Sequence, residues 1–241
     1  MEPTILAIDT ATENCSVALR RGSQVWQRQA LSPREHSQRV LGFITEVLAE
    51  AKLNKTDITG IVASIGPGSF TGVRIGVSVA QGLAFSLQVP VVGVSTLAAL
   101  AQRALRELGA TRVVAAIDAR MKEVYLAQYE LDNGQLKCVV EPRVGPPDHH
   151  WLAQQLVGAE GLVAVGTGSI EYASAFSAFA TVHEQLALPQ AEDFLTLGWA
   201  QLQQRQQGAE LAGELSANEL EPLYVRNEVT WQKITPQVKL N

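Results

Sequence analysis

The hydrophobic pattern opens with three short apolar runs separated by polar turns. Ile5 to Ile8 is closed by Asp9, and the runs Cys15 to Leu19 and Gln24 to Ala30 follow at close spacing. Runs of this length, bounded by polar and glycine-containing turns, are typical of strands. The first 30 residues therefore predict a three-stranded meander with an aspartate at the end of its first strand.

The pattern then changes to a helical period. Ser32 and Glu35 have the spacing of a capping box, with proline at the first helical position, which predicts a helix to about Lys52. Leu41 and Gly42 lie off its apolar stripe, and a mid-helix glycine costs roughly 1 kcal/mol relative to alanine. Close packing of a second helix and a tolerated surface glycine both remain open. The predicted core stripe is Val40, Phe43, Ile44, Val47, Leu48 and Ala51.

A glycine-rich junction, from Gly66 to Gly76, joins the apolar strand Ile61 to Ile65 to a helix ending near Leu87. Glycines and hydroxyls at a helix N-terminus expose backbone N–H groups, which can bind an anion. A P-loop is excluded, because the Lys-Ser/Thr pair that reaches the terminal phosphates is missing. The residues assigned to this nucleotide or anion cradle are Asp9, Gly66, Gly68, Ser69, Thr71, Gly72, Arg74 and Asp118.

Small residues recur every fourth position in this helix, at Gly72, Gly76, Ala80 and Ala84. They form a smooth face on which another backbone can lie closely. Arg74 is unusual, because a cation in the first turn opposes the helix dipole. We expect an anion beside it, either a carboxylate of this chain, or a phosphate or a carboxylate of a partner protein.

The opening order of elements then repeats. After a strand over 89–94 and a helix over 96–108 capped by Ser95, a strand over 112–117 ends in Asp118 and is followed by a hairpin over 123–140. We interpret this as an internal duplication, with lobes at 1–108 and 109–241.

The second lobe continues with a helix over 148–156, a strand over 162–165 and helices over 169–179 and 193–204. The final segment, which carries Tyr224 and Trp231, either packs back on the first lobe or binds a partner.

Composition narrows the classes of function. With 241 residues and 46 % hydrophobic content the chain can bury a large core, and its net charge of −5 argues against unaided binding to nucleic acid. The four histidines lack metal-ligand spacing, and Cys15 and Cys138 are expected to be small buried hydrophobes, so no metal site is expected. No apolar run approaches the ~18 residues of a membrane span. A soluble, cytoplasmic protein is expected.

Asp9 and Asp118, at the ends of equivalent strands beside a glycine-rich junction, have the layout of an actin-like or sugar-kinase-like ATPase cleft. In such clefts the two aspartates handle metal and attacking water. Aspartates in this position also commonly accept N–H bonds from the turns that follow them. Both interpretations are open on these residues alone.

Six stretches, 5–12, 33–37, 66–76, 93–97, 116–120 and 165–168, together resemble the TsaB (YeaZ) family. That resemblance implies an α/β, actin-like (ribonuclease H-like) fold of two related lobes, each a mixed sheet with flanking helices. It also implies a non-catalytic subunit of the machinery that makes threonylcarbamoyladenosine in tRNA. The related catalytic subunit, TsaD, has a metal-binding histidine pair where this chain has Thr96 and Leu100.

The resemblance further implies partners. The chain would pair with TsaD, with itself when TsaD is absent, and with the ATPase TsaE, would meet tRNA only through the complex, and would not meet a membrane. No cofactor would be required, while weak nucleotide binding stays open. The alternative is an actin-like kinase or ATPase acting on its own. The residues assigned to the partner interface are His36, Arg39, Val40, Leu41, Gly42, Ile75 and Val79.

Overall fold

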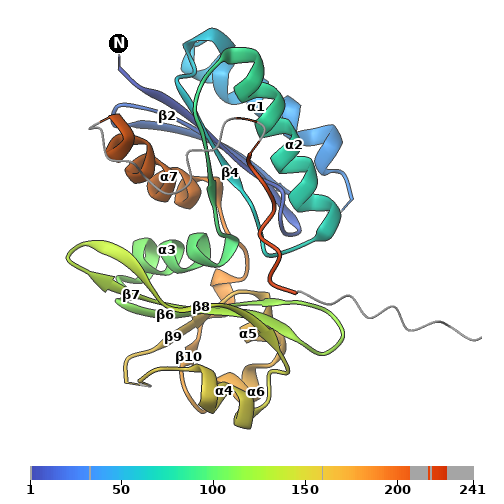
Figure 1. Cartoon of the computed structure of the whole chain (residues 1–241), viewed down its shortest axis with the longest axis vertical. Helices are drawn as coiled ribbons and strands as arrows, with labels where there is room; N and C mark the ends of the chain where they lie inside the picture. The colour runs from blue at the N-terminus through green and yellow to red at the C-terminus, as the bar shows by residue number, and fades with distance from the viewer. Residues whose placement is uncertain (1, 33, 159, 207–216, 218, 227–241) are drawn as a thin grey trace, which may run out of the picture.

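The structure is a computed structural model that describes residues 2–32, 34–158, 160–206, 217 and 219–226. Its elements form two lobes, one above the other in Figure 1. The first lobe has strands β1 (Thr4–Asp9), β2 (Asn14–Arg21), β3 (Gln24–Leu31), β4 (Gly60–Ser64) and β5 (Val91–Val94). The second has β6 (Arg112–Asp118), β7 (Val124–Asp132), β8 (Gln135–Gly145), β9 (Val163–Val165) and β10 (Thr181–Val182). The α-helices are α1 (His36–Ala51), α2 (Phe70–Leu87), α3 (Thr96–Leu108), α4 (His149–Gln155), α5 (Thr167–Glu171), α6 (Ala173–Phe176) and α7 (Ala191–Gln206), and two short 3-10 helices are η1 (Lys55–Asp57) and η2 (Glu184–Leu186).

The two sheets have the same topology. Their strand orders are β3-β2-β1-β4-β5 and β8-β7-β6-β9-β10. In each, the first three strands pair antiparallel and the remaining two run parallel to the first. The fold is therefore the actin-like, ribonuclease H-like arrangement of two related mixed sheets, and the predicted meander, hairpin and duplication are confirmed.

Helix α1 begins later than its predicted capping box. Its first residue is His36, and Glu35 stands at the N-cap without a side-chain bond. Arg34 has a left-handed backbone with φ 72°, while the Ser32 amide donates to the Glu13 carbonyl at 2.9 Å. Ser32 thus extends the pairing at the edge of the meander instead of capping the helix, and its hydroxyl has no partner.

The predicted helix over 169–179 is broken in two. Tyr172, between α5 and α6, has φ −112° and ψ 35°, outside the helical region. The chain then forms β10, a two-residue strand that the hydrophobic pattern did not indicate. In Figure 1, α6 lies at the bottom of the lower lobe, with α5 and β10 above it.

The last helix of each lobe in the sequence packs on the sheet of the other lobe, so that the two helices are exchanged between the lobes. Helix α3 packs on β6, β7 and β8 of the second sheet, and α7 packs on β1, β2, β4 and β5 of the first. Between them, Arg106 Nε lies 2.9 Å from Oδ1 of Asp193, which is fully buried. Burial raises the pKa of Asp193 to about 6, although the Arg106 guanidinium acts in the opposite direction. The sequence boundary after residue 108 therefore does not separate two independent packing units.

Helix α2 lies on the first sheet, against β4 and β1. Within the described residues, α2 is the one helix that is long enough, at 18 residues, and apolar enough, with a mean hydropathy of 1.2, to cross a membrane. The expectation that no run approaches this length is therefore wrong. Its face of small residues is buried, as in a helix that packs on the sheet of an α/β protein. Such a core helix can have the same length and hydropathy without crossing a membrane.

Candidate functional site

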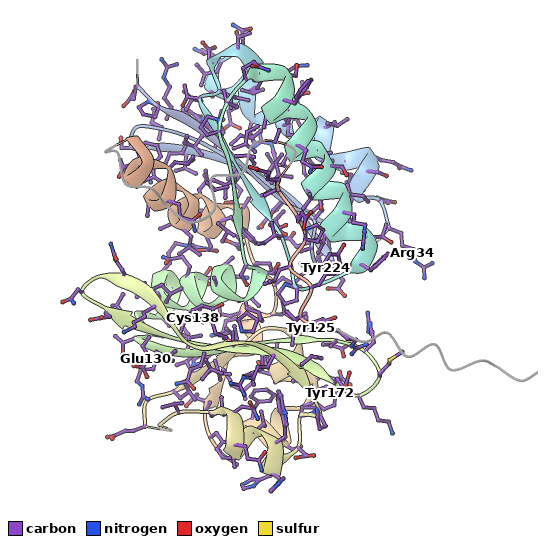
Figure 2. The ribbon with its side chains drawn as sticks, viewed as in Figure 1. Arg34, Tyr125, Glu130, Cys138, Tyr172 and Tyr224 are labelled. Atoms are coloured by element: carbon purple, nitrogen blue, oxygen red, sulfur yellow. The ribbon has the colours of Figure 1, made fainter. Side chains whose placement is uncertain are left out.

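A cavity of about 880 Å³ lies between the lobes. The first lobe contributes the β1–β2 loop (Ala11–Glu13) and the N-terminal ends of α1 and α2, and the second contributes the β6–β7 turn and α5. In Figure 2, Arg34 at the end of the upper lobe and Tyr125 of the lower lobe both lie on the right-hand side of the molecule, and both line the cavity. This is the position of the cleft expected for an actin-like fold.

Five of the eight residues assigned to the cradle line this cavity, and three do not. Gly68, Ser69, Thr71, Gly72 and Asp118 face it. The other three, Asp9, Gly66 and Arg74, are absent from its lining. The structure thus separates the two aspartates that the sequence placed together.

Asp9 is sealed inside the first lobe. Its side chain is fully buried, Oδ1 accepts from the Ala11 amide at 2.9 Å, and Oδ2 has no hydrogen-bond partner. Burial raises the pKa of Asp9 to about 6, while the Ala11 bond and the nearby Ser64 hydroxyl act in the opposite direction. Asp9 is therefore buried in the first lobe and does not line the cavity.

Asp118 faces the cavity but is held by its own turn. Its Oδ1 accepts from the Arg120 amide at 3.0 Å, and its Oδ2 lies 2.9 Å from the Arg120 guanidinium. Asp9 and Asp118 therefore make the same bond, to the amide two residues on. The hydrogen-bonding role proposed for both aspartates is confirmed, and it accounts for their equivalent positions in the duplicated units.

The junction glycines accommodate the β1–β2 loop. A Cβ at Gly68 would overlap the Ala11 carbonyl oxygen, and a Cβ at Gly72 would overlap the Thr10 carbonyl oxygen. The Ser69 amide donates to the Ala11 carbonyl at 2.7 Å. One N–H group of the predicted cradle is therefore already bonded within this chain. The backbone that lies against the small-residue face of α2 thus belongs to the same lobe.

The buried carboxyl of Asp9 should make stability depend on pH. Because its pKa is raised from 3.8 to about 6 in the folded state, its contribution is full below pH 3.8 and is lost as the pH rises through 6. That rise corresponds to roughly 3 kcal/mol. In urea titrations at pH 4, 6 and 8, Asp9→Asn should gain about this much relative to the unsubstituted protein between pH 4 and pH 8. Parallel pH profiles for the two proteins would contradict the assignment.

Arg74 contacts two aromatic residues of this chain. Its Nη2 donates to the Tyr224 hydroxyl at 2.6 Å, its Nη1 donates to the Phe70 carbonyl, and the guanidinium stacks 3.4 Å from the Phe70 ring centre. No described carboxylate pairs with Arg74. Instead, the Phe70 ring and the Tyr224 hydroxyl offset the unfavourable interaction of Arg74 with the helix dipole. Tyr224 comes from the far end of the chain.

The predicted partner interface divides between surface and core. His36 and Val40 are buried, with exposed fractions of 6 % and 0 %, so they are not available to a partner in this structure. Burial lowers the pKa of His36, while a bond with the Thr12 backbone acts in the opposite direction. Arg39 is at the surface and pairs with Glu35 at 2.8 Å.

The remaining interface residues lie on the outer faces of α1 and α2. Leu41 is 55 % exposed, and nothing lies within 4 Å of a Cβ built on Gly42. Ile75 and Val79 line a shallow groove of about 400 Å³ with other α2 residues. Phe85, also on α2, is 65 % exposed. Helical periodicity placed Leu41 off the core stripe, but the exposure of Phe85 had no separate signal in the sequence.

Several cavity residues escaped the sequence assignment, among them Arg120 and Tyr125. Arg120 lies two residues after Asp118 in the β6–β7 turn, and its guanidinium also lies 3.8 Å from Glu13 across the cavity. Tyr125 faces the cavity from the start of β7. Arg120 could have been identified from its place beside the strand-end aspartate, whereas Tyr125 reads from the sequence as an ordinary strand residue.

Comparison with known proteins decides the family. Residues 29–233 match the family described as "TsaD: tRNA N6-adenosine threonylcarbamoyltransferase". Over 236 residues the chain is 43 % identical to "tRNA threonylcarbamoyladenosine biosynthesis protein TsaB" of Escherichia coli (strain K12), covering 95 % of this chain and 97 % of that protein. The protein of the same name from Haemophilus influenzae is 39 % identical, with 96 % and 97 % covered. The chain belongs to the TsaB family.

A solved structure agrees with this membership. The Pseudomonas aeruginosa protein described as uncharacterized "with similarity to peptidase YEAZ" is 40 % identical, covers 93 % of this chain and all of its own length, and superposes with a TM-score of 0.83. In this member of the TsaB family, Thr96 and Leu100 are both fully buried on α3. Within the described residues, no group of three or more His, Cys, Asp or Glu side chains is placed to hold a metal ion.

Proposed function

We propose that this chain is a non-catalytic scaffold and activator in the synthesis of threonylcarbamoyladenosine in tRNA. It would pair with TsaD, the enzyme that transfers the threonylcarbamoyl group from threonylcarbamoyl-adenylate to the adenosine beside the anticodon of ANN-decoding tRNAs. The names of its full-length relatives support the pathway. The observation that carries the non-catalytic role is the enclosure of Asp9, which removes one of the two carboxylates that an actin-like ATPase cleft requires.

The outer face of α1 and α2 is the surface that we assign to TsaD, and to a second copy of this chain when TsaD is absent. Leu41 and Phe85 expose more than half of their side chains there, and Gly42 allows a second helix to approach closely. TsaE would join the assembled pair. With a net charge of −5, the chain would meet tRNA through the complex.

Any nucleotide in the cavity would be held weakly. The amide of Ser69, at the α2 N-terminus, is already bonded to Ala11, and Asp118 is engaged with Arg120. The cations that face the cavity, Arg34 and Arg120, could still attract phosphate. We therefore propose that no cofactor is required.

A kinase or ATPase acting alone is the competing function, because Asp118 and the helix N-termini do face a large cavity. ATP turnover by the purified chain with Mg²⁺ separates the two. We expect no phosphate release above that of a protein-free control, because Asp9 is enclosed. Steady turnover by the unsubstituted chain that Asp118→Asn abolishes would overturn the scaffold assignment.

A further inference from the structure

The segment Leu220–Arg226 connects the two lobes on the outside of the molecule. Figure 1 shows it descending beside α2 from the upper lobe to the lower one, and Figure 2 places Tyr224 between them. It is extended and belongs to neither sheet. Its contacts differ in kind at its two ends.

The first end is anchored in the upper lobe. Leu220 is 1 % exposed within the hydrophobic core of that lobe, and its carbonyl accepts from Gln81 Nε2 at 3.0 Å. The Leu223 amide then donates to the Ile65 carbonyl at 2.8 Å, at the end of β4. Apolar burial and these two hydrogen bonds anchor this end of the segment in the first lobe.

The middle of the segment rests on the first turn of α2. The Tyr224 hydroxyl accepts from Arg74 at 2.6 Å, and its ring lies 5.4 Å from the same guanidinium. Tyr224 remains 56 % exposed. The segment therefore passes from a buried anchor to contacts that water can reach.

The last described residue reaches the second lobe. The Arg226 guanidinium pairs with the Glu123 carboxylate, and its Nη1 lies 3.5 Å from the sulfur of Met121. Both charged side chains are partly exposed, at 22 % and 35 %. An ion pair at this degree of exposure is open to competition from salt and from other charged groups.

The receiving turn is itself strained. Arg120, Met121 and Lys122 have φ of 62°, 55° and 61°, a left-handed conformation that is rare for residues other than glycine. The same turn lines the cavity, and Arg120 reaches across it towards Glu13. Glu13 and Arg226, neither of which belongs to the second sheet, thus both contact this turn.

We propose that Leu220–Arg226 is a strap that sets the opening of the interlobe cavity, with the Arg226–Glu123 pair as its releasable latch. The exchanged helices α3 and α7 also join the lobes, so loss of the latch would let the strained turn relax and the lobes move apart about these helices. This inference stands whether or not the chain activates TsaD, since it concerns the spacing of the two lobes alone.

Interlobe distances test the strap. Spin labels at Gln38→Cys on the first lobe and Lys137→Cys on the second, in a Cys138→Ser background, report the distance by pulsed electron paramagnetic resonance. Cys15 is buried and should remain unlabelled. With the latch intact we expect one narrow distance distribution, and with either Glu123→Gln or Arg226→Gln a broader one, lengthened by several ångström.

Two further variants keep the test decisive. Arg28→Gln breaks ion pairs with Glu46 and Glu50 inside the first lobe and should leave the distribution unchanged. The double swap Glu123→Arg with Arg226→Glu should restore the narrow distribution. Distributions that are identical with and without the latch, or that shift equally in Arg28→Gln, would overturn the proposal.

Discussion

Replacing Gly72 with alanine is expected to lower the free energy of unfolding by about 3 kcal/mol, the upper range for overpacking a core. The added Cβ would overlap the Thr10 carbonyl oxygen, which is backbone and cannot rotate away. Relief requires that α2 and the β1–β2 loop separate, which also breaks the 2.7 Å bond from the Thr10 hydroxyl to the Gly72 carbonyl. Urea denaturation followed by circular dichroism measures the loss.

Gly82 supplies the matched control in the same helix. Nothing lies within 4 Å of a Cβ built there, so Gly82→Ala should raise stability by up to about 1 kcal/mol through helix propensity. Opposite signs for the two variants are therefore expected. If Gly72→Ala were as stable as the unsubstituted protein, the β1–β2 loop would not lie against α2, and the enclosure of Asp9 would lose its support.

Replacing Gly42 with glutamate is expected to leave the fold intact and to weaken association by several kcal/mol. Within the chain, a Cβ added at Gly42 has nothing within 4 Å, so the substitution introduces no overlap at its first side-chain atom. In the proposed interface it would place volume and an unpaired charge between two closely packed helices. Sedimentation velocity measures self-association and pairing with TsaD, while circular dichroism checks folding.

Gln135→Glu adds the same charge on the β7–β8 hairpin of the other lobe and should change neither property. Weakened association in this control would indicate a general effect of negative charge. A folded Gly42→Glu protein that still dimerises and binds TsaD at full strength would place the interface on a different surface.

The sequence was sufficient to predict most of the fold, because its signals there are local. Strand–aspartate–hairpin order recurs at residues 5–30 and 112–140, and the two sheets do share one topology. The start of α1 was misplaced because Arg34 adopts a left-handed conformation, which a capping-box pattern does not reveal. The exchange of α3 and α7 between lobes depends on tertiary packing and has no periodicity of its own.

The site was less predictable, because its decisive contacts join residues distant in sequence. The glycine-rich junction was correctly located, but its glycines serve the loop around Thr10, about sixty residues earlier. Arg74 finds Tyr224, separated from it by 150 residues, instead of a carboxylate. Propensity and motif spacing identify which residues are unusual, whereas the partner of each depends on the folded arrangement.

Threonylcarbamoyl transfer in a defined mixture tests the central claim most directly. Purified TsaD, TsaE, ATP, threonylcarbamoyl-adenylate and an ANN-decoding tRNA would be combined with and without this chain, and modified nucleoside would be quantified by mass spectrometry. We predict product when the unsubstituted chain or Asp118→Asn is present, and little when the chain is omitted or replaced by Gly42→Glu. Equal product in its absence would contradict the role of the chain as an activator.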